Sequence, residues 1–268
     1  MKIAVYLFLV FGFFAAPSSL LAAGATQAPL RIVSTSLCSD SYVLDAQLKP
    51  ASITALSWQS RGDLSMAPQS PRARPLARDD AETLLSLNPT HVIFGPGEGG
   101  HSAAILDAAG IKHMALKWGE SFETYDDNEF TLRTFLGLPN FRKEPRGFIP
   151  NDDGPLVLYL SRSGGTAGSD TFVDAVITAA GGRNIITESR WRPAELETLI
   201  TLKPDLIITS FFENGSESAQ SKGVRNRALQ NLIAETPHVN VPGKYWPCAG
   251  PGLGDARNII AAAIKALP

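Results

Sequence analysis

The chain contains one stretch twice: ETLLSLNPTHVIFG at residues 82–95 and ETLITLKPDLIITS at residues 197–210. The copies share Glu, Thr, two Leu, Pro and Ile at matching positions, where roughly one identity is expected by chance at ordinary residue frequencies. Each copy predicts a short amphipathic helix, a Pro that ends it and a buried strand. A helix-to-strand unit that occurs twice, far apart, indicates two similar α/β lobes rather than a solenoid, which needs three or more repeats.

The rest of the chain alternates short apolar runs with amphipathic segments. A first strand is expected over 31–34, and a similar opening leads into a strand over 157–160, followed by a flexible loop over 161–168. Alternation of strands and helices in short units predicts parallel, doubly wound, Rossmann-like sheets. We therefore expect an α/β fold with an N-terminal lobe over 26–118, a C-terminal lobe over 155–268 and a ligand cleft between them.

Residues 119–154 are expected to connect the lobes. A short helix is predicted over 127–136, after which Pro139, Pro145 and Pro150 interrupt any regular structure. The connector is therefore predicted to be short and largely irregular.

The N-terminus has the features of a secretory signal peptide. Lys2 precedes an apolar run over 3–16, and the small residues at 23–25 provide an A-x-A cleavage site. The apolar run is short for a membrane span, so a cleaved signal peptide over 1–25 is preferred to a membrane anchor. No Cys lies near the cleavage site. We therefore expect an exported, periplasmic protein that carries no lipid at this site.

The charge balance argues against one class of partner. The chain carries a formal net charge of −2 and has no run of basic residues. Nucleic-acid-binding domains usually present a basic patch that neutralises phosphates. We therefore expect a small-molecule ligand and no nucleic acid.

The carboxyl ends of the expected strands carry aromatic residues. In the first lobe, Trp58 follows a strand over 53–57 and Trp118 follows a strand over 111–116. In the second lobe, Phe211 follows the strand of the second repeat and Trp246 follows a strand over 239–241. Ligands of parallel α/β sheets bind at these ends of the strands. Two lobes that present such ends to each other would form an aromatic cleft, which is the usual character of a small-molecule site.

Together these features resemble the class III periplasmic binding proteins, the cobalamin- and ferric-siderophore-binding components of ABC importers. The resemblance rests on the exported chain, the two related lobes, a Glu-x-x-x-x-Leu-x-Pro element in each lobe and the Trp246 loop before the last helix. It covers nearly the whole chain after the signal peptide. It implies a monomeric binding protein, with no enzymatic activity and no cofactor, that delivers cobalamin, a ferric siderophore or haem to a membrane permease.

In that family, one Glu at the top of each lobe docks into Arg pockets of the permease. Glu82 and Glu197 occupy the matching positions, seven residues before the Pro of each repeat. Glu82 has an alternative role, because Asp79 and Glu82 are spaced as a capping box. Glu197 lies too far into its helix to cap it if Pro193 is the first helical residue, and its alternative is an ordinary solvated carboxylate.

The resemblance also implies aromatic and cationic side chains around a metal chelate or corrinoid. Trp58 and Trp246 are candidates to stack on a planar or bulky ligand, with core packing as their alternative. Phe211 would line the same cleft. Arg162 and His101 could meet anionic groups of the ligand, with surface solvation as the alternative for each.

Cys38 and Cys248 are the two cysteines of the chain, and both are expected on loops at strand ends, one in each lobe. In an oxidising compartment such a pair favours a disulfide, which would join the lobes and limit their opening. A pair of thiolates that contacts a metal or the ligand is a second interpretation, in which Cys38 lines the cleft. Two unrelated thiols are the third.

Two other functions have some support in the sequence. GPGEGG over 95–100 fits the dinucleotide-binding pattern G-x-G-x-x-G, and Glu120 lies about 20 residues further on. The match falls late in its lobe, Pro96 and Glu98 suit a pyrophosphate poorly, and export removes the protein from the nicotinamide pool. A bare metal-ion site would need clustered ligands, and the four His residues show no ligand spacing.

Overall fold

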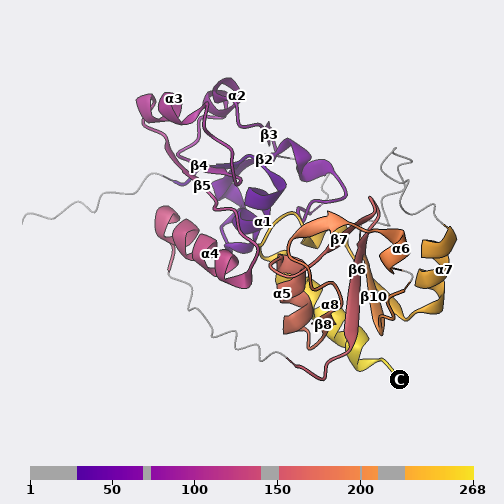
Figure 1. The fold of residues 1–268 in the computed structure, drawn as a ribbon. Helices are drawn as coiled ribbons and strands as arrows, with labels where there is room; N and C mark the ends of the chain where they lie inside the picture. Colours follow the sequence, from indigo (N-terminus) through magenta and orange to yellow (C-terminus); the bar gives the residue numbers. More distant parts are fainter. Residues whose placement is uncertain (1–28, 69–73, 140–150, 200, 211–226) are drawn as a thin grey trace, which may run out of the picture.

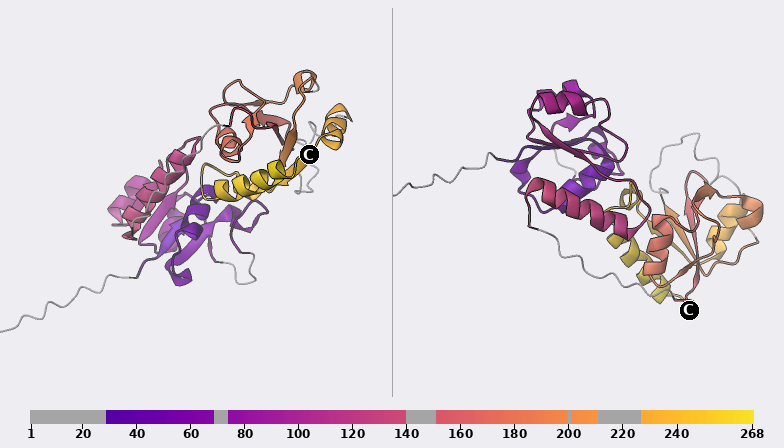
Figure 2. Two further views of the ribbon diagram at one scale, coloured as in Figure 1. Left: turned by 90° about the horizontal axis from the view of Figure 1, so that it is seen from below. Right: turned by 60° about the vertical axis from the view of Figure 1, so that its left-hand side comes forward.

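The computed structural model describes residues 29–68, 74–139, 151–199, 201–210 and 227–268 and shows two α/β lobes (Figure 1). Figure 2 shows the same lobes from two further directions, each with its own sheet and helices. The α/β fold with two lobes that the repeat predicted is confirmed. No helix among the described residues is both long and apolar enough to cross a bilayer.

The N-terminal lobe is built on a five-stranded parallel sheet with the order β3-β2-β1-β4-β5. This order matches the start of the 3-2-1-4-5-6 order of doubly wound folds. Its strands are β1 (Ile32–Ser34), β2 (Ile53–Ser57), β3 (Leu76–Ala77), β4 (His91–Phe94) and β5 (Lys112–Ala115). Its helices are α1 (Leu37–Asp45), α2 (Ala81–Ser86), α3 (Ala103–Ala108) and α4 (Phe122–Leu136), with 3-10 turns η1 (Pro50–Ser52) and η2 (Trp58–Arg61).

The C-terminal lobe has a four-stranded parallel sheet with the order β11-β10-β6-β8. Its strands are β6 (Leu156–Ser161), β8 (Arg183–Asn184), β10 (Leu206–Ser210) and β11 (His238–Val241). Its helices are α5 (Phe172–Ala179), α6 (Leu196–Leu199), α7 (Arg227–Glu235) and α8 (Gly252–Lys265), with a 3-10 turn η4 (Gly243–Tyr245). A separate antiparallel pair joins β7 (Gly165–Ala167) to β9 (Trp191–Pro193). The prediction of a flexible loop over 161–168 was therefore wrong for its second half, which pairs with a segment distant in the chain.

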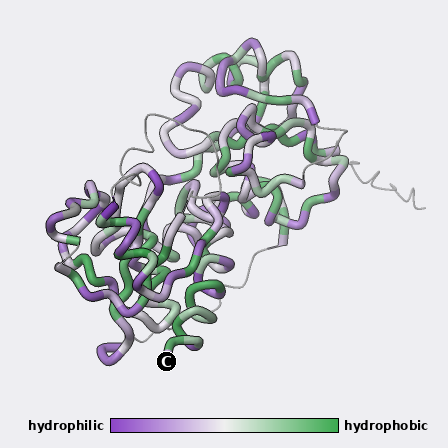
Figure 3. Tube along the Cα trace, turned by 90° about the vertical axis from the view of Figure 1, so that its right-hand side faces the viewer, coloured by the Kyte–Doolittle hydropathy of each residue, from purple (hydrophilic) through white to green (hydrophobic). Residues whose placement is uncertain are grey.

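Helices cover both faces of each sheet because successive side chains of a strand point to opposite faces. Along β1, Ile32 shares a core with residues of α1 and α4, whereas Val33 shares a core with residues of α2 and α3. In β6, Tyr159 packs with α5 and α8, and Leu158 packs with α6 and α7. Figure 3 shows hydrophobic segments, drawn in green, inside both lobes and along the helix that leads to the C-terminus.

The repeat has a simple physical basis. Leu84 and Leu199 occupy the same position of the two copies, and both are buried under their sheets. Ile93 and Ile208, also equivalent, are buried on the opposite face of each sheet. Full burial of such a side chain contributes about 1.5–3 kcal/mol. The shared Leu and Ile residues therefore mark positions at which each lobe depends on burial.

Helix α4 differs from the predicted connector helix. It begins at Phe122, before the predicted start at 127, because Ser121 caps it by accepting a hydrogen bond from a backbone N–H of the first turn. It ends at Gly137, which takes the left-handed conformation with φ of 66°. Leu132 and Leu136 of α4 are buried in the core of the N-terminal lobe. This part of the connector is therefore packed structure rather than an irregular link.

Candidate ligand-binding cleft

A cleft of about 580 Å³ opens where the two lobes meet. Trp118, which follows β5, lines it from the N-terminal lobe, and the rest of the wall comes from β6, the β7–β9 pair, the start of α5 and the loop before α8. Five of the lining residues are aromatic: Trp118, Tyr159, Phe172, Trp191 and Trp246. The cleft lies beyond the carboxyl ends of β5 and β6, where ligands of parallel sheets bind.

Four of these rings form one packed cluster. Trp246 lies nearly parallel to Phe172, with ring centroids 6.1 Å apart, and meets Tyr159 edge-on at 5.9 Å. Trp191 meets the edges of Phe172 and Tyr159 at 5.1 and 6.0 Å. Such edge-on and offset contacts are the favoured aromatic geometries. The cluster therefore forms a continuous apolar wall.

The exposure of the rings shows which of them a ligand could cover. Trp246 is only 5% exposed, and its buried indole N–H has no hydrogen-bond partner among the described residues. Trp191 is 42% exposed, and Trp118, on the N-terminal side of the cleft, is 69% exposed. The two exposed indoles therefore leave aromatic surface open to a ligand, whereas Trp246 is covered and packs against Tyr159 and Phe172.

Polar groups line one part of the same cleft. The hydroxyls of Ser161 and Ser163 lie 2.9 Å apart, and Ser161 Oγ accepts a hydrogen bond from the Gly165 N–H at 3.0 Å. Arg192 also lines the cleft, with its guanidinium 3.7 Å from the carboxylate of Glu188. A partly exposed pair of this kind is weak, so the Arg192 cation is able to turn to an anionic group of a ligand.

The carboxylate of Glu120 joins the lobes at the edge of the cleft. Glu120 lies between β5 and α4 in the N-terminal lobe. It accepts hydrogen bonds from the backbone N–H of Phe172 at 3.1 Å and from the indole N–H of Trp191, at 3.1 and 3.2 Å to its two oxygens. In the sequence, Glu120 stood out only by its spacing from the glycine-rich pattern over 95–100.

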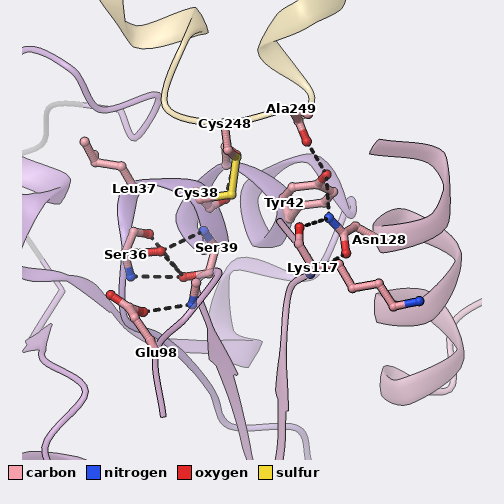
Figure 4. The surroundings of a disulfide bond; sticks show 12 residues. Ser36, Leu37, Cys38, Ser39, Tyr42, Glu98, Lys117, Asn128, Cys248 and Ala249 are labelled. Carbon is pink, nitrogen blue, oxygen red and sulfur yellow. Dashed lines mark hydrogen bonds between the residues drawn. A yellow bond between two sulfur atoms is a disulfide. The ribbon is translucent and has the colours of Figure 1, made fainter. Parts of the chain in front are cut away.

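A disulfide between Cys38 and Cys248 also crosses from lobe to lobe (Figure 4), with Cα atoms 5.7 Å apart. Of the three interpretations that the sequence left open, the structure shows the first, and neither sulfur remains as a thiolate ligand. Beside it, Tyr42 donates a hydrogen bond to the carbonyl of Ala249 at 2.6 Å, and Asn128 donates to Tyr42 at 3.4 Å. Burial raises the pKa of the Tyr42 phenol, so it stays a protonated donor.

The structure brings one of the predicted ligand-binding residues, Trp246, into the wall of the cleft. Trp58 lies on η2, where it is half exposed and the guanidinium of Arg78 is 4.9 Å from its ring. His101 is exposed in the turn after β4. Neither Trp58 nor His101 is among the residues that line the cleft.

The remaining predicted residues of the second lobe lie close to the cleft or outside the described chain. Arg162 directly follows the lining residue Ser161, is half-buried and donates its backbone N–H to the Ser210 carbonyl. Phe211 lies outside the described residues. Sequence reasoning missed Trp191 as a lining residue, because β9 was not predicted. Trp118, which the sequence places at the end of a strand, does line the cleft.

Glu82 and Glu197 are both exposed, on the equivalent helices α2 and α6. The expected capping box was wrong, because Asp80 rather than Asp79 caps α2, accepting a hydrogen bond from the Thr83 N–H at 2.8 Å. The expected helix start at Pro193 was also wrong. Pro193 ends β9, and α6 begins at Leu196, so Glu197 lies in its first turn.

The glycine-rich loop after β4 is already filled by a side chain of the protein. The carboxylate of Glu98 accepts hydrogen bonds from the Gly95 N–H at 2.8 Å and from the Thr35 hydroxyl at 2.5 Å. A phosphate in this loop would have to displace the Glu98 carboxylate, and it would then be repelled by that nearby negative charge. Among the described residues, no group of three or more His, Cys, Asp or Glu side chains could hold a metal ion.

Comparison with known proteins gives one partial match in sequence and several matches in fold. No family model matches the chain. A cobalamin-binding protein of Halobacterium salinarum is 34% identical over 110 residues, which cover 35% of this chain and 30% of that protein. The matched stretch is thus about a third of either protein.

Solved structures match over most of the chain. A periplasmic heme-binding protein of Pseudomonas aeruginosa has a TM-score of 0.63 at 21% identity, covering 90% of this chain and 94% of that one. The periplasmic heme-binding protein HutB of Vibrio cholerae has a TM-score of 0.62 at 22% identity, with 88% and 99% covered. The vitamin B12-binding protein BtuF of the same organism has a TM-score of 0.58 at 19% identity, with 88% and 97% covered. The expected resemblance to periplasmic binding proteins is therefore confirmed for the fold.

Proposed function

We propose that this protein is the substrate-binding component of an ABC importer, which captures a metal chelate or corrinoid and delivers it to a permease of the inner membrane. The cleft carries this proposal. It lies between two lobes of a binding-protein fold and presents the exposed indoles of Trp118 and Trp191, with the Arg192 cation nearby. Aromatic surfaces suit a large, flat or bulky ligand, and a few placed polar groups orient it.

The ligand class follows from this chemistry and from the relatives. Cobalamin, a ferric siderophore and haem all combine an extended organic surface with polar or anionic edges. Relatives of similar fold or sequence are named for heme, vitamin B12 and cobalamin. In this proposal the protein catalyses no reaction, so ligand affinity and permease docking are its whole mechanism.

Docking is proposed to use Glu82 and Glu197. Both carboxylates are exposed, and each lies in the first turn of its helix, one in each lobe. Two negative charges held apart by the lobes would fit two Arg pockets on a permease. Carboxylates at such a rim mainly set the orientation and the rate of association.

The proposed compartment is the periplasm, reached after removal of the signal peptide over 1–25, and the proposed working form is a monomer. The disulfide between Cys38 and Cys248 agrees with an oxidising compartment. Mass measurement of the exported protein tests the cleavage site and the oligomeric state together.

Native mass spectrometry of the purified protein tests the function directly. The protein is offered an equimolar mixture of cyanocobalamin, haemin, several ferric siderophores and NAD. We expect an adduct with one of the chelates or corrinoids, retained at low micromolar concentration, and none with NAD. An NAD adduct without any chelate adduct would refute the proposal.

A further inference from the structure

Glu120 is a feature of the lobe junction that the proposed function does not yet use. Its carboxylate is held in the N-terminal lobe and binds the indole of a cleft residue in the C-terminal lobe. We propose that Glu120 is a positioning residue, which holds Trp191 in the cleft wall and so sets the distance between Trp191 and Trp118. It would thereby select the thickness of the ligand, a part of the inference that rests on the proposed function.

The segment that carries Glu120 is fixed on its own side. Asn128 of α4 accepts a hydrogen bond from the Lys117 N–H at 2.8 Å and donates one to the Lys117 carbonyl at 3.0 Å, as Figure 4 shows. Gly119 passes so close to Thr124 that a Cβ there would collide with its side chain. Glu120 therefore reaches across the junction from a rigid base.

Among the described residues, the indole N–H of Trp191 has Glu120 as its hydrogen-bond partner. Its ring meets Phe172 and Tyr159 through edge-on apolar contacts, and 42% of the residue is exposed. Contacts of that kind tolerate several orientations of a ring, whereas a hydrogen bond to a carboxylate is directional and strong. Glu120 therefore selects one orientation of the indole among those that packing allows.

The same carboxylate also fixes the element behind Trp191. One oxygen accepts the backbone N–H of Phe172, the first residue of α5. A negative charge is favourable at this end of a helix, because the N-terminal N–H groups are unpaired there. Glu120 thus holds both the indole and the helix on which the indole rests.

Trp118 lies two residues before Glu120, on the same fixed segment, and contributes the other exposed indole of the cleft. One short segment of the N-terminal lobe therefore presents one exposed indole of the cleft directly and holds the other through Glu120. The position of this segment would therefore set the width of the gap between Trp118 and Trp191. A thin, flat ligand and one with bulky axial groups should respond differently when the contact is lost.

The contact itself is tested without ligand, by the indole N–H signals in ¹H–¹⁵N NMR spectra. Trp191→Phe, which keeps an aromatic ring and removes the donor, assigns the Trp191 signal. In Glu120→Ala this signal should move and its hydrogen exchange should accelerate at least about tenfold, as expected for loss of a hydrogen bond to a charged group. Glu120→Gln should give an intermediate result. A Trp191 signal that is unchanged in Glu120→Ala overturns the proposal, and the Trp246 signal serves as the internal control.

The effect on selection is tested with two probes, haemin as the flat one and cyanocobalamin as the one with axial groups. In Glu120→Ala, the ratio of the two dissociation constants should change by about threefold or more, and the change should nearly vanish in the Trp191→Phe background. An equal loss for both probes, together with a lower melting temperature, would mean that Glu120 serves only the fold. If neither probe nor any siderophore binds the wild type, the proposed function fails, while the NMR result still decides the contact.

Discussion

Trp118 and Trp191 are the side chains on which ligand affinity should depend most directly. Both line the cleft with a large part of the indole still exposed, whereas Trp246 is already covered by its neighbours. Burying an exposed ring against a flat ligand removes apolar surface from water and adds stacking contacts. Covered rings instead contribute to the fold.

We expect Trp118→Ala and Trp191→Ala each to weaken chelate binding about threefold to tenfold, since an aromatic contact contributes about 0.5–1.5 kcal/mol beyond its buried area. Titration followed by tryptophan fluorescence measures the affinity. Trp58→Ala is the matched control, because Trp58 is equally an exposed indole but does not line the cleft. An equal loss in Trp58→Ala would restore Trp58 as a ligand residue, as the sequence suggested.

Asp40 is a buried carboxyl group in the first turn of α1, where it accepts hydrogen bonds from the hydroxyls of Ser34 and Ser57 and from the Ser57 N–H. Burial raises the pKa of Asp40, and these donors only partly offset the effect. Because the pKa is higher in the folded than in the unfolded state, the associated stability is complete below the unfolded pKa of about 3.9. It is lost as the pH rises through the folded value.

Asp40→Asn removes this titration. Relative to the variant, the wild type should therefore lose unfolding free energy as the pH rises from about 4 to 7, measured by urea unfolding at each pH. Asp80→Asn is the control of opposite sign, because the hydrogen bond from the Thr83 N–H lowers the pKa of Asp80. Its contribution is present above the unfolded pKa and is lost as the pH falls. If the difference in unfolding free energy between wild type and variant changed with pH in the same way for Asp40→Asn and Asp80→Asn, the opposite pKa shifts of the two carboxyl groups would be contradicted.

At the scale of elements, each repeated unit has a buried side and an exposed side. Leu84 and Leu199 face the cores, while Glu82 and Glu197 face solvent at the starts of α2 and α6. The buried positions are accounted for by the fold. The two Glu side chains are exposed and form no hydrogen bond or ion pair with the described part of the chain, so a role outside the protein is the proposal for them.

The double variant Glu82→Ala with Glu197→Ala should reduce ligand uptake about tenfold or more, the loss expected for one or two hydrogen bonds to charged groups. Ligand affinity should not change, since neither residue lines the cleft. Uptake into cells and titration of the purified protein measure the two quantities. Asp79→Ala with Glu195→Ala is the matched control, because it removes two nearby exposed carboxylates and changes the net charge equally. A loss of uptake in both double variants would point to general charge rather than docking.

For the whole molecule, the lobes are joined by more than the connector. The disulfide links residues 210 positions apart, the Tyr42 hydroxyl adds a hydrogen bond to Ala249, and Glu120 adds contacts at the cleft. A covalent link between distant positions removes much of the freedom of the unfolded chain. The arrangement of the lobes should therefore depend strongly on the redox state.

Cys38→Ser with Cys248→Ser should lower the free energy of unfolding by about 2–5 kcal/mol, mainly because the unfolded chain is no longer constrained. Urea unfolding of the variant, and of the wild type with and without reductant, measures the change. Tyr42→Phe is the comparison, and it should cost about 1–2 kcal/mol because it removes two neutral hydrogen bonds at the same junction, the one to Ala249 and the one from Asn128. Identical unfolding curves with and without reductant would show that the disulfide contributes nothing.

The sequence by itself determined the parts of this protein that depend on local periodicity. The buried strands, the helices beside them and the two lobes follow from the spacing of apolar residues, because burial of a strand or helix face repeats along the chain. Local signals predicted the start of a helix less reliably where two neighbouring residues could each serve as the N-cap, as at Asp79 and Asp80. They were also less reliable where a Pro suited two elements, as at Pro193.

Only the tertiary structure decided the site. Trp191 became a cleft residue because β9 pairs with β7, and Glu120 became its partner because two lobes meet. The choice between a disulfide and free thiols at Cys38 likewise depended on a contact across 210 positions. Such contacts leave no periodic trace in the chain, since the direction of a side chain at a strand end is set by the loops and the opposite lobe that surround it.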